Sequence, residues 1–443
     1  MRSPGFATRG ICDECRRAGP GRPFRPREGQ RSGDRASVGG PREQSGAGGH
    51  VVIATLAAAS GCVAWAYLLG ARGGFWRARV RDDTPVAMDD LAAWPAVTAV
   101  IPARDEASVI GPNLASLLRQ DYPGTFCVIV VDDHSSDATA AIAREVARSE
   151  RASRVTVLAA PALAAGWTGK SWALDHGVRH AAMSAERPDY LLLTDADIAH
   201  APDTLRTLVT RAGRDGLLLT SLMAKLNARS AAERAMIPAF VFFFQMLYPF
   251  AWVNARRRAT AAAAGGCMLV HRESLDSAGG IAAIRGELID DCALARLMKA
   301  HGPIGIALTG RVTSTRAYRS FGEIRNMIVR TAFTQLDFSG WRLLATVAAM
   351  LVVFVAPPLF ALAASDAIVR GLGLVAFACM VLAYQPILRF YRLSPAWALA
   401  LPLVAAAYAA LTLDSAWQHL RGRGGEWKGR VRARATLPDS TRS

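Results

Sequence analysis

The sequence predicts an α/β domain with a largely parallel sheet, joined to one N-terminal and about three C-terminal transmembrane helices. Short β-branched runs alternate with amphipathic stretches between residues 94 and 338, which is typical of strands that alternate with covering helices. Uncharged apolar runs flank this region on both sides, each near the length that crosses a hydrocarbon core of ~30 Å. Hydrophobic residues make up 51% of the 443 residues, which excludes a disordered chain.

The N-terminal part predicts a leader followed by a membrane anchor. Residues 1–49 are rich in Gly, Pro, Arg and Ser, a composition that cannot bury a core, so we expect disorder there. The apolar run Val51–Leu69 predicts a transmembrane helix over residues 50–71, because it is long for the apolar core of a signal peptide and follows a leader of 49 residues. Arginines follow it at positions 72, 77, 79 and 81. By the positive-inside rule we expect residues 72–340 to face the cytoplasm.

The central region contains five strand candidates with helices between them. The strands are expected at Val97–Ile101, Val128–Val131, Val155–Leu158, Leu191–Thr194 and Leu217–Leu219. The helices are expected at Val109–Leu118, Thr139–Ala147 and Ser171–Ala181. Ligands bind beyond the carboxyl ends of the strands in sheets of this kind. Residues that directly follow the strands are therefore where we expect the chemistry.

Residues 235–255 carry no charge and are rich in aromatic residues. The segment is long enough to span a bilayer. A span here would separate residues 264–291 from residues 100–200, and the candidate site described below needs both. We therefore expect a helix that lies in the membrane interface or lines a substrate groove.

Three uncharged apolar runs follow and predict transmembrane helices within residues 341–415; they are Leu343–Ala364, Gly371–Leu388 and Pro395–Leu413. Pro357 and Pro358 predict a kink in the first of them. Residues 416–443 form a basic tail. If the catalytic domain is cytoplasmic, one anchor and three spans would put both basic tails on the other side of the membrane, which the positive-inside rule disfavours. Either one apolar run is re-entrant or the tail lies outside.

The net charge of +16 does not indicate nucleic-acid binding. Residues 1–49 contain 10 Arg and 5 acidic residues, and residues 421–443 contain 7 basic and 2 acidic residues, so each tail contributes +5. No basic stripe or nucleic-acid motif lies between the tails, which argues against a nucleic-acid partner. The seven cysteines form no repeating framework, which favours a reducing compartment over a disulfide-stabilised fold.

Carboxylates cluster after the expected strands. The acidic segments are Pro102-Ala103-Arg104-Asp105-Glu106, Asp132-Asp133, Asp195-Ala196-Asp197 and, farther along, Asp290-Asp291. One such segment alone is usually a solvated turn or a helix cap. Asp195 and Asp197 lie one residue apart directly after an apolar strand, so their carboxylates converge at the sheet edge. Hard oxygen ligands of this kind suit Mg²⁺ or Mn²⁺, and such a cation would offset the charge on a diphosphate leaving group.

A glycine-containing loop adds a cation to the same edge. Gly166-Trp167-Thr168-Gly169-Lys170 precedes an expected helix. The backbone N–H groups at a helix start suit a phosphate, and Lys170 would add its charge. The spacing is not that of a P-loop, which argues against nucleotide hydrolysis. A solvated lysine at a helix start is the simpler alternative.

Together these segments resemble the family 2 glycosyltransferases, which have the GT-A fold, over about residues 95–335. Pro102 to Glu106 match the family's opening motif, with Asp105 where Asn is more usual. The resemblance implies that Asp132 and Asp133 contact the base and ribose of a nucleotide sugar, that Asp195 and Asp197 bind the metal ion, and that Asp291 is the general base. The residues expected to bind the donor are Pro102, Arg104, Glu106, Asp132, Asp133, Lys170 and Asp195.

A closer resemblance is to the membrane glycosyltransferases associated with hopanoid biosynthesis. It rests on Gly166–Ala173, Ile237–Val253, Thr260–Val270, Ile281–Ala293, Arg330–Leu336 and Gly424–Arg430. The residues expected near the acceptor or elsewhere around the site are Gly265, Gly266, Asp290, Arg330, Gln335, Trp427 and Arg430. Gly265 and Gly266 would let the backbone approach the acceptor, or would only form a tight turn. Arg330 could equally extend to the membrane interface, and residues 427–430 could close over the site or touch lipid headgroups.

We therefore expect a membrane-bound inverting glycosyltransferase in a bacterial-type inner membrane, with its catalytic domain in the cytoplasm. The resemblance implies a nucleoside-diphosphate sugar, most simply UDP-linked, a divalent cation, and a lipid acceptor such as a hopanoid or another polyisoprenoid. A processive polysaccharide synthase is an alternative, although the QxxRW motif of such enzymes is absent. A non-catalytic membrane scaffold is another, and the intact Asp195, Asp197 and Asp291 argue against it.

Overall fold

The computed structural model describes residues 45–83, 93–149 and 154–422 of the chain. Most of the expected leader and most of the expected basic tail, including Trp427 and Arg430, lie outside the described residues. The residues from Gly48 onward form one unit, which contains both the sheet and the apolar helices.

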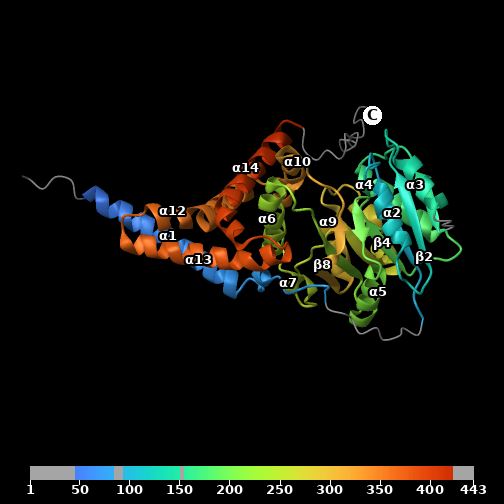
Figure 1. Cartoon of the computed structure of the whole chain (residues 1–443), viewed down its shortest axis with the longest axis horizontal. Helices are drawn as coiled ribbons and strands as arrows, with labels where there is room; N and C mark the ends of the chain where they lie inside the picture. The colour runs from blue at the N-terminus through green and yellow to red at the C-terminus, as the bar shows by residue number, and fades with distance from the viewer. Residues whose placement is uncertain (1–44, 84–92, 150–153, 423–443) are drawn as a thin grey trace, which may run out of the picture. The chain divides into compact units, whose positions relative to one another are not determined.

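An eight-stranded sheet forms the core of the α/β domain (Figure 1), with the strand order β3-β2-β1-β4-β7-β6-β8-β5. Its strands are β1 (Val97–Ala103), β2 (Phe126–Asp132), β3 (Val155–Ala159), β4 (Tyr190–Thr194), β5 (Ile198–His200), β6 (Leu219–Lys225), β7 (Cys267–His271) and β8 (Ile304–Ser314). Strands β3, β2, β1 and β4 run parallel, as do β6 and β8. Strand β7 is antiparallel to β4 and β6, and β5 is antiparallel to β8. The carboxyl ends of β1, β2 and β4 therefore share one edge.

Helices cover both faces of the sheet, as the alternation of strands and helices predicts. Val100 and Val131 share one core with side chains of α4 (Gly169–Ala182) and α9 (Asp290–His301). Their neighbours Ile101 and Val130 point to the other face, because successive side chains of a strand alternate. That face packs on α2 (Ile110–Leu118), α3 (Thr139–Ser149) and α5 (Thr204–Asp215). Further helices complete the domain; they are α7 (Phe250–Asn254), α8 (Arg272–Ser277), η2 (Ile281–Ile284), α10 (Phe321–Thr331) and η3 (Thr334–Leu336).

The structure confirms the first four expected strands and shifts the fifth. The run expected as a strand at Leu217–Leu219 lies at the start of β6, which begins at Leu219 and continues to Lys225. Strands β5, β7 and β8 were not expected from the sequence. Because β7 is antiparallel to both of its neighbours, the sheet is mixed rather than largely parallel in its second half.

Four segments among the described residues are long and apolar enough to cross a membrane, one before the sheet and three after it. They are α1 (Ser45–Gly70), α11 with α12 (Gly340–Met350 and Ala356–Ala363), α13 (Ala367–Phe390), and η5 with α14 (Pro395–Ala400 and Leu401–Leu420). A wide π-helical turn, η4 (Leu351–Val355), separates α11 from α12. It lies directly before Pro357 and Pro358, where the sequence predicts a kink, because a proline cannot donate the hydrogen bond of a regular helix.

Helices α1, α12 and α13 pack side by side (Figure 1). The Trp65 indole of α1 donates a hydrogen bond to the Val353 carbonyl at 2.8 Å, and the Cys62 thiol donates to the Leu372 carbonyl at 3.2 Å. At the α12–α13 contact, a Cβ on Gly373 would lie 2.6 Å from the backbone nitrogen of Ala361. Only glycine allows the two helices to approach this closely.

Helix α14 contacts the α/β domain in its middle and near its C-terminal end, and the end of α13 contacts the same domain. The carbonyl of Phe390, the last residue of α13, accepts a hydrogen bond from Lys225 of β6 at 2.9 Å. In the middle of α14, the Tyr408 hydroxyl donates to the Met236 carbonyl at 2.9 Å. Near its C-terminal end, Asp414 lies 2.5 Å from the guanidinium of Arg325 in α10.

The aromatic segment at residues 235–255 forms two helices rather than one. Helix α6 (Ala231–Leu247) begins with a capping box made by Ser230 and Glu233, and Tyr248 and Pro249 separate it from α7. Neither helix is among those long and apolar enough to span a membrane. The Phe243 ring of α6 lies 5.3 Å from Phe354 of η4 and 5.1 Å from Tyr408 of α14. Helix α6 is thus packed against the apolar helices, and its position in a membrane interface stays a prediction.

The chain between α1 and the sheet is itself bound to β8. The Asp82 amide donates to the Leu308 carbonyl at 2.9 Å, and the Leu308 amide donates to the Val80 carbonyl at 3.0 Å. The Asp82 carboxylate lies 3.4 Å from the Arg311 guanidinium. The anchor therefore joins the sheet near one edge, and β3 forms the opposite edge.

Candidate active site

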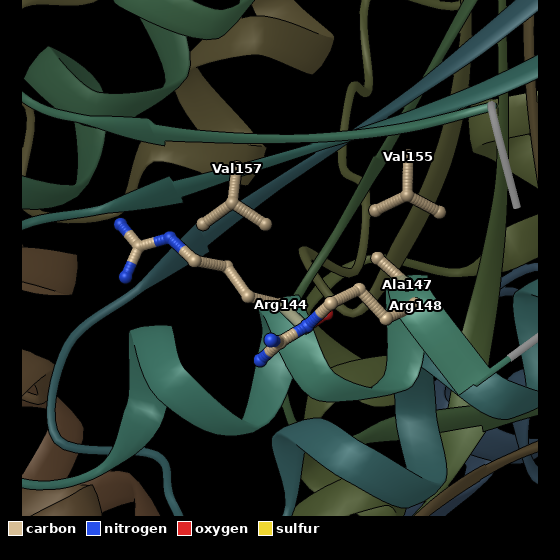
Figure 2. A pocket seen from close by; sticks show the side chains of 5 residues that line it. All are labelled: Arg144, Ala147, Arg148, Val155 and Val157. Atoms are coloured by element: carbon tan, nitrogen blue, oxygen red, sulfur yellow. The ribbon is translucent and has the colours of Figure 1, made fainter.

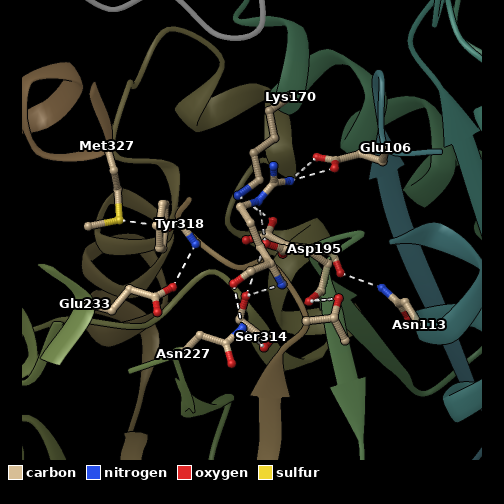
Figure 3. A network of polar contacts seen from close by, with 12 residues as sticks. Glu106, Asn113, Lys170, Asp195, Asn227, Glu233, Ser314, Tyr318 and Met327 are labelled. Carbon is tan, nitrogen blue, oxygen red and sulfur yellow. Dashed lines mark hydrogen bonds and ion pairs between the residues drawn. The ribbon is translucent and has the colours of Figure 1, made fainter. Parts of the chain in front are cut away.

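Three of the acidic segments and Lys170 meet at the carboxyl edge of the parallel strands (Figure 3). Asp195 follows β4, Asp290 begins α9, and Lys170 lies in the first turn of α4. The Lys170 Nζ atom lies 2.9 Å from Asp195 Oδ1 and 3.1 Å from Asp290 Oδ2. Thr168 caps α4 by accepting a hydrogen bond from the Ser171 amide, which fixes the turn that carries Lys170. Residues far apart in the sequence thus form one cluster.

Asp291 is held by backbone hydrogen bonds beside this lysine. Its Oδ2 atom accepts from the Gly265 amide at 2.9 Å, and its Oδ1 atom accepts from the Cys292 amide at 2.7 Å. Burial raises the pKa of Asp291 to about 6; the Asp290 charge adds to the rise and Lys170 opposes it. A carboxyl group with a raised pKa suits a general base that works near neutral pH.

Gly265 is required by the close approach of two side chains. A Cβ at this position would lie 3.3 Å from Asp291 Oδ2 and 3.3 Å from Lys170 Nζ. Gly265 therefore lies directly against Asp291, the predicted base, and Lys170, the predicted phosphate-binding residue. Gly266 is crowded instead by Ile198, at 3.1 Å from the position of a Cβ. Any contact of either glycine with an acceptor stays a prediction.

Arg316 is a member of the cluster that the sequence analysis missed. It follows β8, and its Nε atom donates to Asp197 Oδ2 at 2.9 Å. Its Nη2 atom donates to both carboxylate oxygens of Glu106, at 2.7 and 2.6 Å. The guanidinium therefore joins the first acidic segment to the third. Burial alone would lower the pKa of Arg316, but Asp197 and Glu106 raise it above its ordinary value, so the group stays charged.

The loop after β8 also holds Asp197 through its backbone. The Asp197 carbonyl accepts from the Thr315 amide at 2.7 Å and from the Thr315 hydroxyl at 2.9 Å. The Asn227 side chain fixes the same loop by donating to the Ser314 carbonyl at 3.1 Å and to the Arg316 carbonyl at 2.7 Å. The carboxylate and the backbone of Asp197 are thus both set by residues that lie more than a hundred positions later in the chain.

Acidic side chains outnumber basic ones in this cluster. Its acids are Glu106, Asp195, Asp197, Asp290 and Asp291, and its bases are Lys170 and Arg316. Burial raises the pKa of Asp195, and Lys170 opposes that rise. Burial alone would lower the pKa of Lys170, but Asp195, Asp290 and Asp291 raise it, so the lysine stays charged. Five acidic side chains face two basic ones, and this imbalance favours an added cation.

The residues present fit a divalent cation at Asp195 and Asp197. Both supply carboxylate oxygens, the ligands that Mg²⁺ and Mn²⁺ prefer. Within the described ranges, no three or more His, Cys, Asp or Glu side chains are grouped to hold a metal ion on their own. Two carboxylates would leave coordination positions for phosphate oxygens, which is the usual arrangement when Mg²⁺ binds together with a phosphate substrate.

Asp132 and Asp133 lie at the end of β2, and Arg104 connects them to the end of β1. The Arg104 Nη1 atom donates to the Asp133 carbonyl at 2.5 Å and to the His134 carbonyl at 3.2 Å. The side chain of Asp133 is fully buried. The Oδ1 atom of Asp132 is buried without a hydrogen-bond partner among the described residues. Pro102 lies within β1, so these donor-binding candidates share the carboxyl edge with the acidic cluster.

Asp105 shows why a short polar residue is needed in the first acidic segment. Its φ angle is 51°, in the left-handed region that Asn and Asp adopt more readily than other non-glycine residues. Its carboxylate accepts from the Ser136 amide at 2.7 Å and from the Ser136 hydroxyl at 3.0 Å. Aspartate can therefore replace the asparagine that is more usual in the family.

The remaining predicted residues lie farther from the cluster or outside the described part. The Gln335 amide donates to the Tyr248 hydroxyl, which connects η3 to the end of α6. Arg330 is exposed in the last turn of α10. Among the described residues, no ion pair or hydrogen bond joins Arg330 or Gln335 to the acidic residues of the cluster. Trp427 and Arg430 lie outside the described residues.

A hollow of about 440 Å³ lies elsewhere, between α3 and the edge strand β3 (Figure 2). It is lined by Arg144, Ala147, Arg148, Val155 and Val157. None of these residues belongs to a predicted motif. The hollow has no acidic or nucleophilic side chain, so it does not compete with the acidic cluster as a catalytic site.

A family model described as "Glycosyltransferase like family 2" matches residues 95–334, which is more than half of the chain. A segment of 127 residues is 37% identical to the 4,4'-diaponeurosporenoate glycosyltransferase of Staphylococcus aureus (strain USA300). That match covers 28% of this chain and 30% of the relative, so the chain matches less than a third of the relative's length.

A solved structure is similar over most of the chain. The mannosyltransferase PcManGT from Pyrobaculum calidifontis, in complex with GDP-Man and Mn²⁺, superposes with a TM-score of 0.52 at 19% sequence identity. The superposition covers 84% of this chain and 99% of that chain. At this identity the similarity concerns the fold alone.

Proposed function

The chain belongs to the glycosyltransferase like family 2, and from that premise we propose that it transfers one sugar from a nucleoside-diphosphate sugar to a lipid. The observation that carries this proposal is the acidic cluster at the carboxyl edge of the sheet. There Lys170 contacts Asp195 and Asp290, and Asp291 lies beside them with a raised pKa. A basic residue, two candidate metal ligands and a candidate general base in one place match the needs of glycosyl transfer from a diphosphate.

The donor would lie across the carboxyl ends of β1, β2 and β4. Asp132 and Asp133 would contact the base and ribose, and Lys170 would contact the diphosphate. A divalent cation, Mg²⁺ or Mn²⁺, would supply positive charge to the leaving diphosphate when it is held by Asp195 and Asp197. The similar mannosyltransferase was solved with GDP-Man and Mn²⁺. We propose a UDP-linked sugar for this chain, and the assay below includes GDP-linked donors.

Asp291 would act as the general base. Its carboxylate accepts the proton of an acceptor hydroxyl, and the oxygen forms a bond to the anomeric carbon. The bond from that carbon to the diphosphate oxygen breaks, and the nucleoside diphosphate leaves with the electron pair. Attack from the face opposite the leaving group inverts the anomeric centre. The hydrogen bonds from Gly265 and Cys292 hold the carboxylate in one orientation for this step.

A lipid acceptor is supported by the apolar helices that pack on the catalytic domain. Helix α6 contacts both η4 and α14 through Phe243, so the domain that carries the acidic cluster adjoins the apolar segments directly. A hopanoid or another polyisoprenoid is the acceptor class that we propose. The partial relative is named for the transfer of a sugar to 4,4'-diaponeurosporenoate.

The enzyme would lie in a bacterial-type inner membrane, with its catalytic domain in the cytoplasm and α1, α11 to α12, and α13 as spans. The segment that contains η5 and α14 would be re-entrant, because the end of α13 just before it contacts Lys225 of the catalytic domain and its own C-terminal part contacts Arg325 of the same domain. The basic tail would then lie in the cytoplasm, as the positive-inside rule favours.

Cysteine labelling tests this topology in a variant that lacks Cys12 and Cys15. A membrane-impermeant maleimide should label Ser365→Cys, in the turn between α12 and α13, from the side opposite Ser184→Cys of the catalytic domain. Arg421→Cys should behave like Ser184→Cys. Labelling of Arg421→Cys together with Ser365→Cys would show that α14 spans the membrane.

The function is tested with the purified full chain, a panel of UDP- and GDP-linked sugars, and a bacterial membrane lipid extract that contains hopanoids. Mass spectrometry should detect a lipid whose mass increases by one sugar residue with one of the donors. The absence of a glycosylated lipid with every donor, from protein that still binds nucleoside diphosphate, would contradict the proposed acceptor class.

A further inference from the structure

Two segments that are far apart in the sequence meet at Trp252, close to the end of α1. The Arg72 guanidinium lies over the Trp252 ring, 5.0 Å from its centroid, and the Arg258 guanidinium lies 4.9 Å from the same centroid. Arg72 follows the last residue of α1 by two positions. Arg258 belongs to the loop after α7, on the catalytic domain. The catalytic domain thus presents arginines next to the end of the anchor.

The contact is tightly packed. Gly73 has a φ angle of 64°, and a Cβ there would lie 2.7 Å from the Trp252 indole nitrogen. Arg72 also donates to the Met246 carbonyl at 3.0 Å and to the Leu247 carbonyl at 3.1 Å, at the end of α6. Because Arg72 holds α6 and the anchor together, the position of Trp252 relative to the end of α1 is set by the fold.

Several arginines around this contact have no acidic partner. Arg77, Arg257 and Arg258 are exposed, and none of them forms an ion pair with a carboxylate among the described residues. Arg81, which lies close by in sequence, differs because Asp83 lies 3.5 Å from it. Like charges gathered at a surface repel one another, so an anion bound between them would lower the free energy of the folded protein.

The position of these arginines relative to the apolar helices points to the membrane surface. The apolar part of α1 ends at Gly70. The Trp76 indole donates to the Leu69 carbonyl at 3.0 Å, and the Arg77 guanidinium lies 5.2 Å from the centroid of the Trp76 ring. Tryptophan is typical of the headgroup level of a bilayer. Two tryptophans and the arginines beside them therefore lie where lipid phosphates would be.

We propose that Arg72, Arg77, Arg257 and Arg258, with Trp76 and Trp252, form a binding surface for the headgroup phosphates of anionic phospholipids. We call it the arginine surface. A guanidinium matches a phosphate with two parallel N–H donors, which makes arginine better suited than lysine to this contact. The arginine surface would hold the catalytic domain against the bilayer and would fix the height of its acidic cluster above the membrane.

The test compares two triple variants with equal loss of charge. R77Q/R257Q/R258Q removes three exposed arginines of the arginine surface and leaves Arg72, which holds α6. R144Q/R148Q/R154Q is the matched control, because its arginines are exposed and lie at α3 and β3, the sheet edge opposite the anchor. Figure 2 shows Arg144 and Arg148 at that edge. Native mass spectrometry of the detergent-purified full chain, titrated with phosphatidylglycerol or phosphatidylcholine of equal chain length, gives the affinities.

The unsubstituted protein should bind phosphatidylglycerol more tightly than phosphatidylcholine. Each arginine near an anionic surface contributes a factor of about five, so R77Q/R257Q/R258Q should bind phosphatidylglycerol about 100-fold more weakly. The control variant should stay within about twofold of the unsubstituted protein, because its arginines lie away from the anchor. Donor binding should be unchanged in both variants, which separates this test from that of the proposed function.

Three outcomes would overturn the proposal. The first is an unchanged phosphatidylglycerol affinity in R77Q/R257Q/R258Q while its circular dichroism spectrum and elution volume match those of the unsubstituted protein. The second is an equal loss in both triple variants, which would mean that only net charge matters. The third is displacement of phosphatidylglycerol by inorganic phosphate at the same concentration, which would mean that the arginines bind phosphate without selecting a lipid.

Discussion

Lys170 and Arg316 neutralise different halves of one acidic cluster, and the two halves are built differently. Lys170 is a flexible point charge that contacts Asp195 and Asp290, next to Asp291. Arg316 is a planar group fixed by three hydrogen bonds to Glu106 and Asp197. A lysine can move its ammonium to a new partner at little cost, whereas an arginine bound in this way holds its partners in place. We propose that Lys170 changes partners during the reaction and that Arg316 keeps Asp197, the candidate metal ligand, oriented.

The largest effect is expected at Asp291, the proposed general base in the Lys170 half. Asp291→Asn removes the proton acceptor but keeps the shape and the hydrogen bonds from Gly265 and Cys292. We expect kcat to fall about 1,000-fold, with donor affinity by calorimetry within twofold. Asp276→Asn, on the exposed helix α8, is the matched control and should keep full activity. Activity in Asp291→Asn near that of the control would assign the base to another residue.

The two candidate metal ligands lie in different halves, so their substitution tests whether the halves share one cation. Asp195→Asn and Asp197→Asn should each lower Mn²⁺ affinity about 100-fold, because each removes a charged oxygen ligand. Calorimetric titration with Mn²⁺ alone gives the affinity independently of turnover. If only one of the two variants loses affinity, the cation is held within one half of the cluster.

A smaller effect is expected at Arg316, which acts through Asp197. Arg316→Gln should lower Mn²⁺ affinity about 10- to 100-fold, the usual cost of removing a group that orients a metal ligand. Arg316→Lys should recover part of this loss, because it restores the positive charge but not the simultaneous hydrogen bonds to Glu106 and Asp197. A purely structural role would instead lower the melting temperature of both variants and leave Mn²⁺ affinity unchanged in the folded protein.

The smallest effect is the pH dependence that the raised pKa of Asp291 predicts. The base must be ionised, and burial raises its pKa to about 6. The ionised fraction therefore falls as the pH drops through 6, and kcat/KM should decrease about tenfold between pH 7 and pH 5. Rates of the unsubstituted enzyme at saturating Mn²⁺ measure this. A flat profile over that range would mean that Asp291 is already ionised at pH 5 or is not the base.

The sequence predicts the first half of the sheet well for a physical reason. Strands β1, β2 and β4 are covered on both faces, so their residues form continuous apolar runs. Strand β5 has three residues and β8 contains Gly305 and Gly310, and neither gives a clear run or a regular alternation. Strand β7 lies antiparallel between β4 and β6. This position depends on pairing between segments that are distant in the sequence, so a local sequence pattern does not predict it.

The acidic residues of the candidate site and Lys170 are predictable from the sequence, and Arg316 is not. Carboxylates directly after apolar strands are uncommon enough to stand out, so Asp132, Asp195 and their neighbours are found from the sequence. Arg316 follows a strand that the sequence does not predict, and it is one of 52 basic residues. The polar run before it, from Thr313 to Thr315, is the only local signal that could have indicated a strand end there.

The sequence allows for one re-entrant apolar run but does not indicate that this run is the segment of α14. That segment and α13 have similar mean hydropathy, 1.8 and 2.0, and similar length. What distinguishes them is packing, because 44% of the apolar window at α14 is buried in the structure and 33% of that at α13. Hydropathy measures transfer from water and does not tell a protein contact from a lipid contact.

We propose that the acidic cluster catalyses the transfer of one sugar to a lipid. The most direct measurement uses the full chain in bilayers that contain the acceptor lipid. The donor is the nucleotide sugar that is active in the panel of UDP- and GDP-linked sugars, and its sugar carries a radioactive label. Label should appear in the organic phase, with one sugar per lipid and one nucleoside diphosphate released per sugar, and Asp291→Asn should abolish both. Label that stays in the aqueous phase as free sugar or as a polymer, or transfer that persists in Asp291→Asn, would contradict the account.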